Sequence, residues 1–564
     1  MPVHIKRTLA AALLSSCLFV GANPGFAEGA KADAGAYLAA HAAATANDYR
    51  QGAYWFSRAL EGDPTNAPLL EGVVVSYLSL GEIEAAGKAA GQLRELGGKS
   101  ISANIALAAA AALREDYDDL LKDDPDRAIG NLVDGLIRAW AEFGKGSMTE
   151  ALEGFDALAK GEGVKAFALY HKALALAAVG DFEGADEILS GRSDGPIVVN
   201  RRGLLAHVEI LSQLERNDDA IKLVDQSFPG GGDPEVVQIR KRLAAGEILP
   251  FTTVKGGKGG IGEVFFSVAS ALTADAEPSY TLLYSRAAVA LSDGNIEGVL
   301  QSARLLDELG QRELAAETYA RVPAEDPNFH MAEIGRAEAI YALDRKEEAL
   351  GILGTLSRTH AEQSAVFLAL GDMLRREERF KDAADAYQNA IDLTPNPEQR
   401  HWVLFYSLGV SYERTSDWEK SEQNFRRALE LYPDQPQVLN YLGYSLVDRG
   451  EKLEEALEMI QRAVAARPDA GYIIDSLAWA YFRLGRYQDA LEPMERASLL
   501  EPVDPVVTDH LGDVYWENGR KLEARFQWRR ALSFEPEEKE AVRIRRKLEI
   551  GLDEVRKEEG EKTP

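Results

Sequence analysis

Two stretches near the C-terminus decide the fold. Residues 477–502 read LAWAYFRLGRYQDALEPMERASLLEP, and residues 511–536 read LGDVYWENGRKLEARFQWRRALSFEP. Both begin with leucine and a small residue, carry alanine at two matching later positions, and end in a proline. The glycine turns Leu484-Gly485-Arg486 and Asn518-Gly519-Arg520 lie midway along each stretch. Each stretch therefore predicts two helices joined by a tight turn and closed by proline.

Three earlier copies carry the same pattern, opened by Leu370-Gly371, Leu408-Gly409 and Leu442-Gly443 and closed by Pro395, Pro433 and Pro468. The period settles at 34 residues, and the pattern resembles the tetratricopeptide repeat (TPR). Small residues such as Gly409 belong where two helices approach closely, and large ones such as Phe425 and Trp528 fill the space between them. Because one pair cannot bury its apolar face alone, we expect stacked pairs in an all-α, TPR-type α-α superhelical solenoid.

The repeats become irregular towards the N-terminus, and about a dozen helix pairs are expected in all. The expected parts are an irregular N-terminal TPR-like array (28–228), a C-terminal array (263–536) with regular repeats at 364–536, and a charged capping helix with a tail (537–564). Glycines concentrate between 229 and 262, which predicts a flexible connector between two arcs of the solenoid.

The N-terminus has the layout of a secretory signal peptide. Lys6 and Arg7 precede an apolar run, and small residues precede a cleavage site after Ala27. The sequence thus predicts export to the periplasm with residues 1–27 removed. Cys17, the single cysteine, lies in Leu14-Ser15-Ser16-Cys17, which matches a lipoprotein cleavage pattern. The alternative is therefore an outer-membrane lipoprotein held by a lipid anchor at Cys17.

The chain is strongly acidic, with 63 Lys and Arg against 91 Asp and Glu and a formal net charge of −28. Such a surface repels nucleic acid and anionic lipid headgroups. We therefore expect other proteins as partners, no nucleic acid, and a membrane only through the possible lipid anchor. The acidity itself is explained either by solubility or by a preference for basic partners.

No motif in the sequence predicts catalysis. The run from Lys255 to Gly262 is rich in glycine, but Lys258 is followed by glycine instead of Ser or Thr, so it does not match a phosphate-binding loop. The eight histidines lack metal-ligand spacing, and the single cysteine excludes most zinc frameworks. The expectation is a protein that is not an enzyme, without catalytic residues, cofactor or metal.

The first helix of each TPR unit is expected to line a groove. With the Leu-Gly and Leu-Ala pairs buried, helical geometry selects ten groove positions: Asp372, Arg375, Tyr406, Asn440, Tyr444, Asp475, Trp479, Phe482, Asp513 and Trp516. The functional interpretation is a peptide-binding groove with aromatic anchors. The alternative is that the aromatics Tyr444, Trp479 and Trp516 only pack between repeats. Asn440, Asp475 and Asp513 are expected to be exposed, because burying an unpaired polar group is costly.

A wider resemblance rests on three segments that begin at Asn440-Tyr441-Leu442-Gly443-Tyr444, Asp475-Ser476-Leu477-Ala478-Trp479 and His510-Leu511-Gly512-Asp513. They resemble a group of exported proteobacterial TPR proteins, to which the outer-membrane lipoprotein adaptor of a carboxyl-terminal processing protease belongs. Gly262-Glu263-Val264-Phe265-Phe266 is a further mark of that group. The resemblance implies a non-catalytic scaffold in the cell envelope that brings a periplasmic protease or cell-wall hydrolase to its partners. The alternative function is assembly or export of polysaccharide or outer-membrane components.

Overall fold

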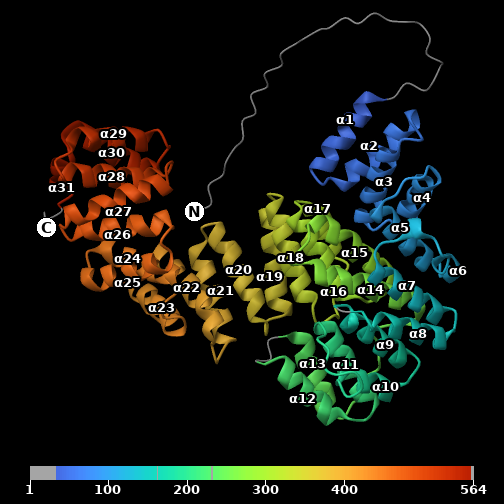
Figure 1. Cartoon of the computed structure of the whole chain (residues 1–564). Helices are drawn as coiled ribbons and strands as arrows, with labels where there is room; N and C mark the ends of the chain where they lie inside the picture. Colours follow the sequence, from blue (N-terminus) through green and yellow to red (C-terminus); the bar gives the residue numbers. More distant parts are fainter. Residues whose placement is uncertain (1–32, 162, 230–232, 561–564) are drawn as a thin grey trace, which may run out of the picture. The chain divides into compact units, whose positions relative to one another are not determined.

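The structure, a computed structural model, describes residues 33–161, 163–229 and 233–560 (Figure 1). The predicted signal peptide, with Cys17, lies outside the described residues. Over the described ranges the chain forms 31 α-helices and two 3₁₀ turns and contains no strand. The predicted fold class, an all-α TPR-type superhelical solenoid, is confirmed. None of the described helices is both long and apolar enough to span a bilayer.

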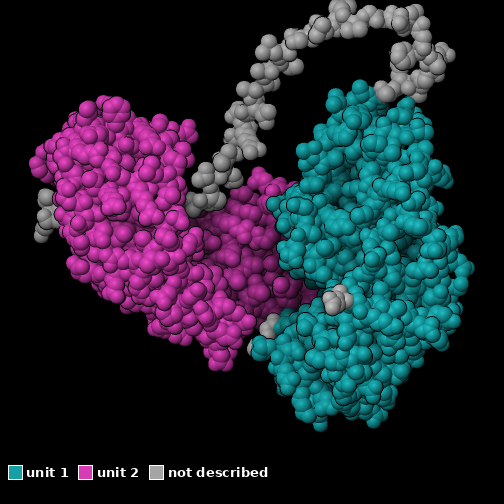
Figure 2. Space-filling model, in the orientation of Figure 1, with its two compact units in different colours: residues 1–318 teal, residues 319–564 magenta. Residues whose placement is uncertain are grey.

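The chain divides into two compact units, residues 1–318 and 319–564 (Figure 2). Unit 1 contains α1 (Ala34–Thr45), α2 (Tyr49–Gly62), α3 (Ala67–Leu80), α4 (Ile83–Glu95), α5 (Ile101–Leu113), α6 (Tyr117–Leu120), η1 (Pro125–Arg127), α7 (Asn131–Gly144), α8 (Met148–Leu158), α9 (Lys165–Ala178), α10 (Phe182–Leu189), α11 (Arg201–Gln213), α12 (Asn217–Ser227), α13 (Pro234–Ala244), α14 (Gly256–Leu272), α15 (Pro278–Leu291), α16 (Ile296–Glu308) and α17 (Arg312–Tyr319), whose last residue is the first of unit 2.

Unit 2 contains α18 (Phe329–Ala342), α19 (Lys346–Thr359), α20 (Ser364–Arg376), α21 (Phe380–Asp392), η2 (Gln399–His401), α22 (Trp402–Arg414), α23 (Trp418–Leu431), α24 (Pro436–Arg449), α25 (Leu453–Ala466), α26 (Gly471–Arg483), α27 (Tyr487–Leu500), α28 (Pro505–Glu517), α29 (Lys521–Leu532), α30 (Glu538–Ile550) and α31 (Leu552–Glu558). The five predicted repeats are the five pairs from α20/α21 to α28/α29. We call the surface formed by α20, α22, α24, α26 and α28 the first-helix face.

Small and large residues meet within each pair as the repeat pattern predicts. A Cβ placed on Gly409 would lie 2.8 Å from the ring of Phe425, and one on Gly512 would lie 2.5 Å from the indole of Trp528. Both aromatic rings are fully buried. Glycine is therefore required on the first helix because the aromatic ring of the second occupies the space of a side chain.

The turns between the paired helices also match the prediction. Gly485 and Gly519 have φ values of +73° and +77°, in the left-handed region that glycine adopts without steric cost. The following helices start two residues later, at Tyr487 and Lys521. This geometry reverses the chain within three residues and sets the two helices of each pair side by side.

The glycine-rich connector predicted at 229–262 is wrong for most of its length. Residues 234–244 form α13, and the run from Gly256 begins α14, a helix whose residues are mostly buried. The division between the units instead follows Thr318. Within unit 1, α14 packs along α7 and also meets α5 and α9 (Figure 1).

The glycines of α14 allow a close approach to α7 instead of supplying flexibility. A Cβ on Gly260 would lie 2.0 Å from the indole of Trp140, and one on Gly257 would lie 2.7 Å from the backbone of Gly144. Further along α14, the buried carboxylate of Glu263 accepts hydrogen bonds from Tyr170 Oη (2.9 Å) and Arg202 Nε (2.8 Å). The glycine run is thus a packing surface, followed by a polar tie to α9 and α11.

The predicted charged helix after residue 537 is present as two helices. α30 and α31 are separated at Gly551, which has a φ of +87°. Both helices carry basic side chains that contact α28, as described below. The last residues of the predicted tail, 561–564, lie outside the described residues.

Candidate functional site: a cavity on the first-helix face

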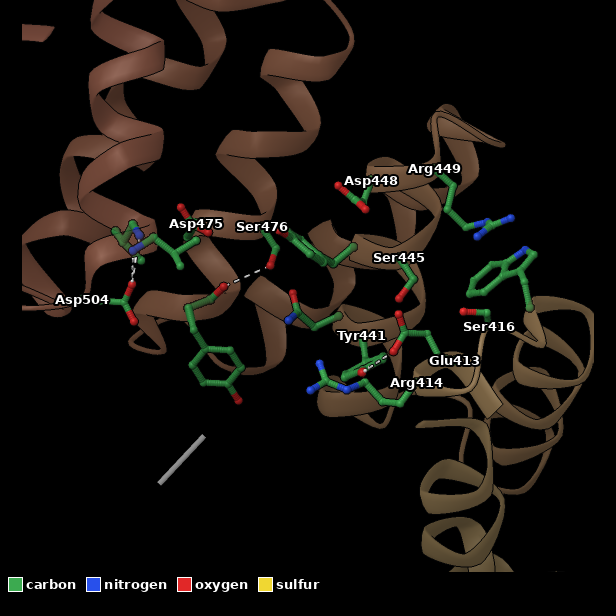
Figure 3. Close-up of a pocket in the computed structure, with 16 residues that line it drawn as sticks. Glu413, Arg414, Ser416, Tyr441, Ser445, Asp448, Arg449, Asp475, Ser476 and Asp504 are labelled. Atoms are coloured by element: carbon green, nitrogen blue, oxygen red, sulfur yellow. Dashed lines mark hydrogen bonds between the residues drawn. The ribbon is translucent and has the colours of Figure 1, made fainter. Parts of the chain in front are cut away.

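A cavity of about 540 Å³ opens on the first-helix face of unit 2, lined by residues of four successive first helices (Figure 3). Its lining comes from the C-terminal end of α22, the length of α24, and the N-terminal ends of α26 and α28, with two residues around the start of α23: Glu413, Arg414, Ser416, Trp418, Asn440, Tyr441, Tyr444, Ser445, Asp448, Arg449, Tyr472, Asp475, Ser476, Asp504, Val506 and Val507. The cavity therefore crosses the face diagonally.

Three of the ten predicted groove residues line this cavity: Asn440, Tyr444 and Asp475. Asn440 and Tyr444 lie one helical turn apart on α24, so both side chains project from the same face. Their shared placement with Asp475 follows from the repeat register, which puts Asp475 of α26 at the position that Asn440 holds in α24.

Three other predicted residues lie outside the cavity: Asp372 and Arg375 on α20, and Tyr406 on α22. Asp372 accepts a hydrogen bond from Tyr387 Oη at 2.7 Å, and Arg375 Nε donates to the same hydroxyl at 3.1 Å. Tyr406 packs edge-on against Tyr441, with ring centroids 5.8 Å apart. These side chains make contacts within their own helix pair or with the next pair, and all three are half-buried.

The remaining four, Trp479, Phe482, Asp513 and Trp516, are buried. Phe482 lies under the guanidinium of Arg556 of α31, 4.7 Å from the ring centroid. The indole nitrogen of Trp516 donates to Asp553 Oδ2 at 3.1 Å. The capping helix α31 covers Phe482 and Trp516, and Trp479 stacks on His510 of the next repeat, so both tryptophans pack as the alternative describes.

The expected exposure of Asn440, Asp475 and Asp513 is wrong, because their exposed fractions are 9%, 5% and 0%. The physical reason differs between them. Asp475 lies 3.0 Å from His510 Nδ1, and Asp513 accepts from Trp528 Nε1 at 2.8 Å. Partners supplied by later parts of the chain compensate the burial of these two carboxylates.

Lys547 of α30 is the residue that sequence analysis missed at the covered end of the face. Its ammonium is fully buried and donates to Asp509 Oδ1 at 2.6 Å and to Asp513 Oδ1 at 2.7 Å. Burial would raise the pKa of Asp513, but Lys547 and Arg543 lower that pKa below its usual value. The signal in the sequence was the spacing: Asp509 and Asp513 lie four residues apart, as do Arg543 and Lys547.

Asn440 is the unusual group of the cavity. Its Oδ1 is buried and has no hydrogen-bond partner within the described part of the chain. The indole Nε1 of Trp418, another residue of the lining, also has no hydrogen-bond partner there. A buried polar atom without a partner costs about 1–3 kcal/mol, so a ligand that supplies the missing donor to Asn440 gains that amount.

The charges around the cavity favour a cation. Glu413, Asp448, Asp475 and Asp504 contribute four carboxylates, against the guanidinium groups of Arg414 and Arg449. Both arginines contact aromatic rings: Arg414 lies 5.1 Å from the ring centroid of Phe380, and Arg449 lies 4.7 Å from that of Trp418.

The negative charge of the lining also affects Tyr444, which lines the cavity. Burial raises the pKa of Tyr444, and the carboxylates of Asp475 and Asp448 raise it further. Its hydroxyl therefore stays protonated at neutral pH and can donate a hydrogen bond to a ligand.

The side chains of the cavity are suited to binding. No His, Cys, Asp and Glu side chains of the described ranges come together in a group of three that could hold a metal ion. The cavity offers hydroxyl, amide and carboxylate groups beside aromatic faces, a combination that serves recognition of polar chain segments.

Comparison with known proteins supports the repeat assignment. A family model described as "Tetratricopeptide repeat" matches residues 396–537, and one described as "Psidin, N-terminal TPR repeats region" matches residues 305–442. The TPR repeat-containing protein PA4667 of Pseudomonas aeruginosa is 28% identical over 188 residues, which is 32% of this chain and 30% of that protein. Protein O-mannosyl-transferase Tmtc1 of Drosophila melanogaster is 28% identical over 137 residues, 22% of this chain and 16% of that protein.

The matched segments thus cover less than a third of the length of these two relatives. Among solved structures, the APC/C hetero-tetramer Cut9–Hcn1 matches with a TM-score of 0.39 and 14% identity, over 92% of this chain and 96% of that chain. YrrB, described as a TPR protein with an unusual peptide-binding site, matches with a TM-score of 0.29 and 20% identity, over 33% of this chain and 94% of that chain. The repeat match over residues 396–537 and the helix pairs of unit 2 show that the chain contains tetratricopeptide repeats, an architecture that presents extended surfaces for binding.

Proposed function

We propose that this chain is a cell-envelope adaptor that holds an extended segment of a client protein in the cavity of unit 2. In this role it brings a periplasmic protease or cell-wall hydrolase to its partners. The observation that carries the binding part of the proposal is the diagonal cavity of about 540 Å³ with Asn440 in its wall, whose Oδ1 has no hydrogen-bond partner within the described residues. The envelope location rests on the signal-peptide pattern of residues 1–27 and on the resemblance to exported TPR proteins.

The dimensions of the cavity suit a short stretch of peptide. From Asn440 to Arg449 the lining of α24 extends for nine residues, or about 14 Å at 1.5 Å per residue. An extended chain covers that length in about four residues. A side-chain amide has both a donor and an acceptor, so Asn440 can pair with a peptide group, and the tyrosine faces can pack against client side chains.

A blocking substitution tests the site without disturbing the buried network around His510. Ser445 lines the cavity and is only half-buried, so Ser445→Trp should fill the cavity with an indole. Glu430→Trp provides the control, because Glu430 lies on α23 outside the cavity with 62% of its side chain exposed. Circular dichroism and the unfolding midpoint establish that both variants fold.

The experiment is a crosslinking pull-down from envelope fractions with residues 28–564, read by mass spectrometry. The expected result is a periplasmic protease or wall hydrolase that the wild type and Glu430→Trp capture and Ser445→Trp does not. Capture of polysaccharide-export or outer-membrane assembly components in the same pattern would replace the adaptor role with the assembly role. Equal capture by Ser445→Trp and the wild type would show that the cavity is not the binding site.

A further inference from the structure

The covered end of the first-helix face shows what kind of group this face accepts. Asn440 of α24, Asp475 of α26 and Asp509 of α28 hold the same register position, two residues before the leucine of each repeat. The last of these residues, Asp509, contacts Lys547 of α30, whose ammonium is fully buried against Asp509 and Asp513. A lysine side chain thus binds on this face where a capping helix covers it.

The open cavity, on the preceding helices, also presents acceptor groups that suit a cationic side chain. It has more carboxylates than guanidinium groups, and its lining contains both Asp475 and Asn440, whose Oδ1 has no hydrogen-bond partner within the described residues. Asn440 is nine-tenths buried, so its side chain is held in the wall of the cavity. A carboxylate accepts at about four lone-pair sites, which leaves Asp475 capacity beyond its contact with His510.

We propose that the cavity is a subsite for a lysine or arginine side chain of the bound segment, with Asn440 Oδ1 accepting one of its N–H groups and Asp475 and its neighbouring carboxylates balancing its charge. This inference rests on the proposed function and adds the chemical class of the client residue. A neutral amide at position 440 fits the role, because it accepts from a cation without placing a second buried carboxylate next to Asp475 in the unbound protein.

The test uses residues 28–564 and a phage-displayed library of random peptides as the probe. Peptides retained by the wild type and lost by Ser445→Trp are selected, synthesised and measured by fluorescence anisotropy. The expected selection contains lysine or arginine at one fixed position. Replacing that residue by glutamine should weaken binding about tenfold, and high salt should reduce the difference.

Three variants make the assignment specific. Asn440→Leu, which is close in volume, should bind the basic and the glutamine peptide with similar, weak affinity. Asn440→Asp copies the position of Asp509 and should increase the preference for the basic peptide. Glu430→Gln, outside the cavity, should behave as the wild type.

Two results overturn the inference and are distinguishable. Selected peptides that need the open cavity but tolerate glutamine at every basic position would refute the cationic subsite and leave peptide binding intact. If no peptide is lost on Ser445→Trp, or none is selected, the proposed binding site itself is wrong. Unfolding midpoints of each variant, measured in parallel, identify any loss of binding that comes from misfolding.

Discussion

The imidazole of His510 lies flat against the indole of Trp479, with ring centroids 3.9 Å apart and planes inclined by 11°. On its other side the indole stacks on Phe482, with centroids 4.7 Å apart. The Nδ1 of His510 lies 3.0 Å from Asp475, so one histidine joins the aromatic stack to the carboxylate that borders the cavity. The buried stack thus fixes the wall of the cavity.

Trp479 should therefore contribute to the stability of unit 2, whereas Tyr444 should contribute mainly to ligand binding and little to stability. Trp479→Ala removes a side chain that is 8% exposed and should lower the free energy of unfolding by about 3–5 kcal/mol. Tyr444→Phe keeps the ring in the cavity wall and should change stability by less than about 1 kcal/mol. Urea denaturation followed by circular dichroism measures both. Similar, small losses for the two variants would mean that Trp479 is an exposed groove residue after all.

The stability of unit 2 should depend on pH through His510. Burial would lower the pKa of His510, but Asp475, Asp509 and Asp513 raise it above its usual value. A raised folded pKa contributes stability that is fully present below the unfolded value of about 6.5 and is lost as pH rises through the folded pKa. The difference in protection between the wild type and His510→Gln, from hydrogen exchange of α26 and α28, should therefore shrink as the solution becomes alkaline.

His330 provides a control of opposite sign in the same unit. Burial, and then His360, lower its pKa, so its contribution is present above the unfolded value and is lost as pH falls. The difference between the wild type and His330→Gln at α18 should grow with rising pH. A His510→Gln effect that changed with pH in the same direction as that of His330→Gln would contradict the charged state assigned to His510.

The capping helices should depend on Lys547. Lys547→Met leaves Asp509 buried without its cation, and Asp513 with Arg543 alone at 3.7 Å, and should cost about 3–5 kcal/mol. Adding Asp513→Asn to Lys547→Met should cost less than the sum of the single changes, by about 0.5–3 kcal/mol. Lys557→Met is the matched control: its ion pair with Glu554 is largely exposed, and the change should stay within about 0.5 kcal/mol. Strictly additive changes would show that the buried contacts are not coupled.

The glycine run of α14 allows a test between packing and flexibility. Gly260→Ala places a Cβ 2.0 Å from the indole of Trp140 and should lower the stability of unit 1 by about 1–3 kcal/mol. Gly259→Ala meets only Val254 Cγ1, at 3.9 Å, and should leave stability unchanged or raise it by up to about 1 kcal/mol. Thermal unfolding of the two variants compares them directly. Neutral effects for both are what a flexible connector would give.

The fold of unit 2 was predictable because the residues that pack together lie close to one another in the sequence. The pairing of Gly409 with Phe425 and of Gly512 with Trp528 recurs within single repeats, so one period of sequence contains both partners. The structural role of Gly260 was not predictable in this way. Its partner Trp140 lies far earlier in the chain. In addition, glycine is expected both in a loop and where two helices cross closely, so the sequence does not distinguish these two structures.

The candidate site was predictable only in part. Helical register predicts groove positions at Asn440, Tyr444 and Asp475, and these three residues line the cavity. It could not show which parts of that face are covered, because the covering groups, such as Lys547 and Arg556, come from a later segment whose docking is tertiary. Helical register predicts the direction in which a side chain points, but it does not predict which later segment packs against that side chain.

The position of α14 has a consequence for the order in which the protein is made. A TPR array in which each pair touches only its neighbours completes its core as synthesis proceeds. In unit 1, however, Trp140 of α7 is covered by Gly260 of α14, and α15 packs on α3 and α5. At roughly 5–20 residues per second, the covering helix follows about 10 s after the tryptophan that it covers. For those seconds the nascent chain exposes an unfinished core, and transiently exposed apolar surface of this kind is prone to aggregation.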